Sequence, residues 1–154
     1  MENKKDKNII VKRAYQDWQK EAKGFTEATI TVSMRALKLY EEFSGYDDFV
    51  NFNVQKAMDF KEWLSKRQSN GKLISSNTKR THLIYVKKFF VWLHEQSGYK
   101  SKINKNSLDY LNPSRQESAI AAADHIIEFP PKEYICELVD SIKGEDEICK
   151  RDRA

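Results

Sequence analysis

Glycine and proline punctuate this chain in the way that is typical of a helical protein. All five glycines follow stretches with the periodicity of an amphipathic helix, where a left-handed residue commonly ends the helix. The prolines, Pro113, Pro130 and Pro131, also lie outside these periodic stretches. No run of any length alternates apolar and polar residues with the two-residue period of a strand. The sequence therefore predicts an all-α fold.

Four periodic stretches predict four helices, and two of them begin with a recognisable capping side chain. Their expected ranges are residues 8–23, 27–44, 54–69 and 76–97. Thr26 and Asn53 are the predicted N-caps of the second and third helices. The expected apolar residues of the first three helices are Val11, Ala14, Tyr15 and Trp18; Ile30, Met34, Leu37 and Tyr40; and Val54, Ala57, Met58, Phe60, Trp63 and Leu64. The fourth has the widest apolar face and is expected at the centre of the core, with Leu83, Val86, Phe89, Phe90 and Leu93 buried.

Charge is distributed unevenly along the chain, although the net charge is only +4. Between Glu62 and Glu95 there is no acidic residue, while the same window carries seven Lys or Arg residues. Such a window indicates a surface for a polyanion, because each cation near a phosphate releases a condensed counterion. A solvated basic face without a partner is the alternative. Residues 113–154, in contrast, include 6 basic and 10 acidic residues. The net charge of the chain therefore changes from positive to negative near Pro113.

Polar residues line up along one edge of two predicted helices. Thr31, Arg35 and Lys38 share a line on the second helix, because residues four and seven positions apart lie on the same side. Thr81, Tyr85 and Lys88 form a similar line on the fourth. Hydroxyls, tyrosine and arginine are frequent phosphate contacts, so the two lines predict a surface for double-stranded DNA. The alternatives are that Asn77 and Thr78 only cap the helix and Tyr85 only packs, or that the aromatic residues stack on single strands.

No motif in the chain indicates catalysis, a metal site or a cofactor. Patterns such as HExxH, GxSxG or a phosphate-binding glycine loop are absent, and Cys136 and Cys149 form no CxxC pair. The longest apolar run, Phe89–Leu93, is too short to span a membrane, and the N-terminal residues lack the apolar stretch of a signal peptide. We therefore expect a cytoplasmic, non-enzymatic protein without cofactors.

Two segments in the predicted helices resemble a known family. Thr26–Ile30 and Ser76–Arg80, the latter followed by Val86–Leu93, are similar to the signature helices of the SAM-like core-binding domain of tyrosine recombinases, the phage-integrase family. The last residues, Glu147–Ala154, resemble the segment that precedes the first catalytic arginine of that family. The resemblance implies that residues 1–112 form a four-helix core-binding domain and that residues 113–129 form a connector. It also implies that residues 130–154 are the beginning of a truncated catalytic domain.

The same resemblance implies a function. The core-binding domain forms half of a clamp around duplex DNA during integration and recombination, and the catalytic residues would lie beyond Ala154. We therefore expect a DNA-binding fragment, mainly monomeric, whose further partners would be other recombinase protomers in the full-length assembly. The alternative is a non-catalytic helical domain that binds another protein, with an incidental basic face. The DNA-facing candidates are Thr29, Thr31, Arg35 and Lys38 on the second helix, and Asn77, Thr78, Lys79, Arg80, Thr81, Tyr85 and Lys88 on the fourth.

Overall fold

Hydroxyl and amide side chains begin several helices of this chain. The computed structural model describes residues 4–69, 71–115 and 118–119, which all belong to one compact unit. Its elements are α1 (Lys4–Asp17), the π-helix η1 (Trp18–Ala22), α2 (Glu27–Ser44), the 3-10 helix η2 (Phe49–Asn51), α3 (Val54–Lys66), β1 (Gln68–Ser69), β2 (Lys72–Leu73), α4 (Ser76–Glu95) and the 3-10 helix η3 (Lys105–Leu111). The all-α prediction is confirmed, and Thr26, Asn53 and Ser75 cap α2, α3 and α4.

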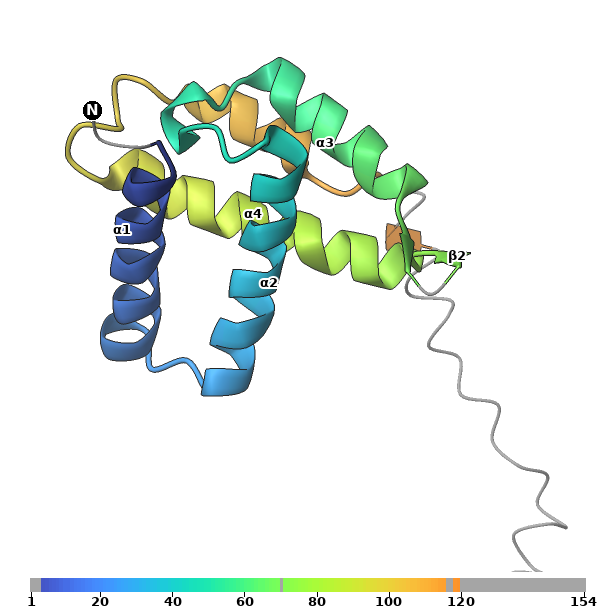
Figure 1. Cartoon of the computed structure of the whole chain (residues 1–154), viewed down its shortest axis with the longest axis horizontal. Coiled ribbons are helices and arrows are strands. Elements are labelled where there is room, and N and C mark those ends of the chain that lie inside the picture. Colours follow the sequence, from blue (N-terminus) through green and yellow to red (C-terminus); the bar gives the residue numbers. More distant parts are fainter. Residues whose placement is uncertain (1–3, 70, 116–117, 120–154) are drawn as a thin grey trace, which may run out of the picture. The chain divides into compact units, whose positions relative to one another are not determined.

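The helices cross rather than stack in parallel. Helices α1 and α2 run in opposite directions and are joined by a short loop, and α4 passes across α2 (Figure 1). Helix α2 packs on α4, while η3 lies against both α3 and α4. The short hairpin of β1 and β2 stands between the end of α3 and the start of α4. Helix α4 therefore contacts most of the other elements, as its wide apolar face predicts.

Two helix boundaries differ from the prediction by three residues or more. The first helix begins at Lys4 rather than near residue 8, and its last turn is π-helical from Trp18 to Ala22. The third helix ends at Lys66 and not near Ser69, because β1 and β2 pair in antiparallel register there. Gly71, with a φ of +76°, makes the left-handed turn between these two strands.

Aromatic side chains fill the core. Tyr40 lies at its centre, with its ring centroid 5.2 Å from that of Phe60 and 5.1 Å from that of Phe90, both in edge-on geometry. All five residues that were predicted for the apolar face of α4 are fully buried. Ala14 and Met58 are exceptions to the predicted stripes, since both are exposed at the surface.

A few polar side chains tie α1 to α2 and to the segment that follows it. The Asn8 amide donates a hydrogen bond to the Asp47 carbonyl oxygen at 2.9 Å and accepts one from the Phe49 backbone at 3.4 Å. The Lys12 ammonium lies 2.6 Å from the carboxylate of Glu41, whose side chain is 2% exposed. These buried and partly buried contacts help to position α1, because an unpaired polar group in the interior would be costly.

Several of the sequence-based predictions concern residues outside the described ranges. They concern most of the connector 113–129, the segment 130–154, and both cysteines. The proposed domain boundary near Asn112 stays a prediction. None of the helices in the described ranges combines the length and the apolar character that a membrane span requires.

Candidate nucleic-acid interface

A cleft of about 670 Å³ opens between α2, the β1–β2 hairpin and the first turns of α4. We call it the α2–α4 cleft. Arg35 and Lys38 line it from α2, and Thr78 lines it from α4. These three residues were predicted as DNA contacts from separate helices, and the fold brings them to one open space. The other lining residues are Leu39, Glu42, Arg67, Ser69, Leu73, Ile74, Ser75 and His82.

The hairpin gives this cleft its third wall. The Ile74 backbone donates a hydrogen bond to the Arg67 carbonyl oxygen at 3.2 Å, which returns the chain to the end of α3 just before α4 begins. The Ser75 hydroxyl then accepts from the Thr78 backbone at 3.2 Å and lies 2.9 Å from the Thr78 hydroxyl. Thr78 is therefore held at the N-terminal end of α4 by the helix cap itself.

Positive charge exceeds negative charge in the α2–α4 cleft. Arg35 and Lys38 are exposed, and neither has an acidic partner among the described residues. Arg67 is paired with Glu42 at 3.1 Å and also lies 4.7 Å from the ring centre of Trp63. Three cations thus face a single carboxylate, and two of them are available to an anion from solution. The acid-free window of the sequence contains Arg67, but only the hairpin explains its place in the cleft.

His82 adds a titratable group to the cleft. The side chain is half-buried, and its Nδ1 atom is buried without a hydrogen-bond partner among the described residues. Burial, and then the positive charge of Arg67, lower the pKa of this imidazole below its ordinary value. The neutral imidazole of His82 is therefore favoured over the charged form in the cleft. The sequence placed it in the basic window, but its role in the cleft depends on tertiary packing.

The other predicted residues of α2 lie nearer its start. Thr31 lines a shallow hollow together with Arg35 and Lys38, and Gln16 of α1 lines the same hollow. The Thr29 hydroxyl lies 3.0 Å from that of Thr26, and its backbone donates to the same oxygen, so Thr29 takes part in the N-cap. The line Thr31–Arg35–Lys38 is thus present at the surface, as the sequence predicts.

The predicted line on α4 is less uniform. The Thr81 hydroxyl donates to the Asn77 carbonyl oxygen at 2.9 Å, a bond within the helix, and Tyr85 packs partly against the core. Lys88 is exposed, lies 5.4 Å from the Tyr85 ring centre and lines a different pocket. Packing against the core was the alternative to DNA contact for Tyr85, and the contacts of its ring favour packing.

Arg80 and Lys79 occupy other parts of the helix surface. Arg80 is exposed but follows Thr78 by two residues, so it projects from the far side, since successive helical residues are rotated by about 100°. Lys79 is half-buried. The structure therefore gathers Arg35, Lys38 and Thr78 in one cleft and leaves Arg80 and Lys88 outside it.

Within the described residues there is no group of three or more His, Cys, Asp or Glu side chains that could hold a metal ion. Comparisons with family models, curated proteins and solved structures found no match to this chain. The resemblance to tyrosine recombinases therefore remains a prediction from the sequence motifs.

Proposed function

We propose that this chain binds double-stranded DNA through the α2–α4 cleft. The observation that carries the proposal is the meeting of Arg35, Lys38 and Thr78, from two helices, at a space with surplus positive charge. Arginine and lysine contact phosphates and release counterions, and a hydroxyl at a helix start can donate to a phosphate oxygen. The protein would act as the non-catalytic, DNA-clamping part of a tyrosine recombinase during integration and recombination.

Two features of the cleft support contact with a phosphate backbone. The first turn of α4 begins beside the cleft, and the positive end of a helix dipole favours an anion. Arg67 is held by Glu42 and the Trp63 ring, so it is already oriented before a ligand arrives. Arg35 and Lys38 would then supply the contacts that are lost when salt is raised.

A double variant tests whether the cleft is the binding surface. We expect Arg35→Ala/Lys38→Ala to weaken binding to a labelled duplex and to reduce the slope of log K against log salt by about two. The matched control is Lys100→Ala/Lys102→Ala, which removes the same charge from exposed residues beyond the C-terminal end of α4. Equal weakening in both variants would show that only net charge matters, and unchanged binding in the cleft variant would remove α2 from the interface.

A further inference from the structure

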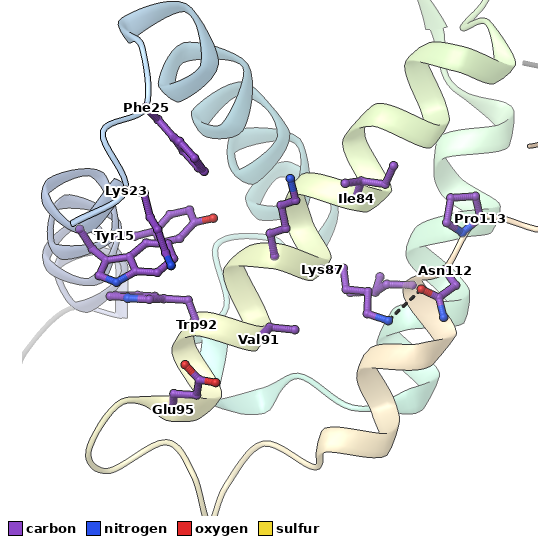
Figure 2. A pocket seen from close by; sticks show the side chains of 13 residues that line it. Tyr15, Lys23, Phe25, Ile84, Lys87, Val91, Trp92, Glu95, Asn112 and Pro113 are labelled. Carbon is purple, nitrogen blue, oxygen red and sulfur yellow. Dashed lines mark hydrogen bonds between the residues drawn. The ribbon is translucent and has the colours of Figure 1, made fainter. Parts of the chain in front are cut away.

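A second hollow, of about 520 Å³, lies along the outer side of α4. We call it the α4 groove. Figure 2 shows Trp92, Lys23 and Phe25 on one side of this groove, Asn112 and Pro113 on the other, and α4 between them. The groove shares no lining residue with the α2–α4 cleft. It is therefore a separate surface, and the proposed DNA contacts at Arg35 and Lys38 do not occupy it.

The floor of the groove is a ridge of α4. Ile84, Lys88, Val91 and Glu95 follow one another at spacings of four, three and four residues, so they lie along one side of the helix. At 1.5 Å per residue this ridge is about 16 Å long, or three helical turns. Val91 is 38% exposed at the surface of the described part of the chain. The ridge is thus a partly apolar helix face open to a partner.

Aromatic residues build one wall of the groove. Trp18 begins the π-helical segment, stacks on Tyr15 with ring centroids 5.7 Å apart, and lies 6.2 Å from Trp92. Phe25, in the loop that follows, is 36% exposed. Single π-helical turns often occur at functional sites, because the wider turn displaces a side chain from the regular helix surface. Tyr15 and Trp92 belong to the buried core, so the apolar surface that this wall presents to solvent comes from half-buried Trp18 and exposed Phe25.

The rim of the groove is mainly basic. The Lys23 ammonium lies 5.2 Å from the centre of the Trp18 ring, and Lys88 projects from the ridge. Lys87 is fixed by the Asp109 carboxylate at 3.1 Å and the Asn112 side-chain oxygen at 2.8 Å. Among the described residues, Glu95 at the C-terminal end of α4 is the one acidic residue that lines the groove. A ligand with apolar residues and acidic flanks complements this pattern.

We infer that the α4 groove is a docking site for an amphipathic, acidic α-helix of a partner protein. A helix of about three turns matches the length of the ridge, and apolar residues at positions i, i+4 and i+7 would cover Ile84, Val91 and the aromatic wall. Its acidic residues would face Lys23 and Lys88. Its N-terminus would lie near Glu95, because the positive end of a helix dipole is favourable beside a carboxylate. Duplex DNA fits this surface poorly, since Ile84 and Val91 offer nothing to phosphates.

Selection from a displayed library of helical peptides tests the inference with the intact chain. We expect the recovered peptides to combine large apolar residues at helical spacing with Asp or Glu. Fluorescence polarisation with one labelled, synthesised peptide then maps its site. Val91→Glu should weaken binding at least tenfold, and Lys23→Glu should weaken it several-fold. The control, Met58→Glu, changes an exposed apolar residue of α3 outside the groove and should leave binding unchanged.

Three results would overturn the inference. The first is recovery of no peptide, or only of basic or patternless peptides. The second is a peptide that binds Val91→Glu as tightly as the unchanged chain, which would place its site elsewhere. The third is displacement of the peptide by duplex DNA at the affinity of the α2–α4 cleft, which would make the groove part of the nucleic-acid surface. All three variants must retain the circular dichroism spectrum of the unchanged protein.

Discussion

Replacing Phe90 by alanine should destabilise the fold strongly. The side chain is fully buried, and its ring stacks on Phe52 with centroids 4.0 Å apart. It also meets Tyr40 edge-on at 5.1 Å and Phe89 at 5.2 Å. Large-to-small changes of buried phenylalanines cost about 3–5 kcal/mol, and each aromatic pair adds about 0.5–1.5 kcal/mol beyond area burial. Because several ring contacts are lost together, we expect a loss of about 4–5 kcal/mol in the free energy of unfolding.

Urea unfolding followed by far-UV circular dichroism measures this loss directly. The control is Val91→Ala on the same helix, which removes an exposed side chain and should change the free energy of unfolding by less than about 0.5 kcal/mol. A loss of under about 1 kcal/mol for Phe90→Ala would refute the reasoning. It would mean that Phe90 does not pack in the core, and stacking on single-stranded nucleic acid would again be a serious alternative.

Three further predictions concern titration, a buried ion pair and the extent of the folded unit. As pH falls below about 6.5, the unfolded state takes up a proton at His82 before the folded state does, so the free energy of unfolding should fall. Urea titrations should show that His82→Gln makes the free energy of unfolding less dependent on pH. An unchanged dependence on pH would contradict this prediction. The single variant Lys12→Met should destabilise the fold more than the double variant Lys12→Met/Glu41→Leu, because the single variant leaves the buried carboxylate of Glu41 unpaired. A thermal unfolding experiment that ranks the two variants in the opposite order would contradict the role of this ion pair. A chain ending at Arg115 should remain folded and bind duplex, since Leu111 is the last buried core residue of the described part; loss of its circular dichroism spectrum would show that later residues complete the core.

The helices were predictable because their signals are local. Thr26 and Asn53 cap the helices at the predicted positions, and the apolar face of α4 is buried as its periodicity indicates. Both signals depend only on residues within one or two turns. The final π-helical turn of α1 was not predictable in the same way, because nothing in the spacing of Trp18 to Ala22 departs from an ordinary helix.

The hairpin was missed because it has no strand pattern. Each strand is two residues long and exposed, so no alternation of apolar and polar residues could reveal it. Its position depends on the left-handed turn at Gly71 and on the place where α3 meets α4. Since the hairpin places Arg67 in the cleft, that residue could not be assigned to the site from the sequence.

The sequence predicted which side of α2 carries the candidate site, but not which residues of α4 belong to it. Helical spacing correctly placed Thr31, Arg35 and Lys38 on one exposed line of α2. On α4, the spacing could not show that the Tyr85 ring packs against the core or that Lys88 lies at another pocket. Those outcomes depend on how the helices cross, which periodicity does not describe.

The dependence of duplex affinity on salt tests the proposed function most directly. If about five phosphates are contacted, log K should fall with log salt at a slope of roughly −4 to −5, because each contact releases slightly less than one counterion. The labelled duplex should be titrated with the intact chain at several salt concentrations and neutral pH. A slope in that range is the result that we predict. Absence of binding, or an affinity that does not change with salt, would contradict DNA binding and favour a domain that recognises only proteins.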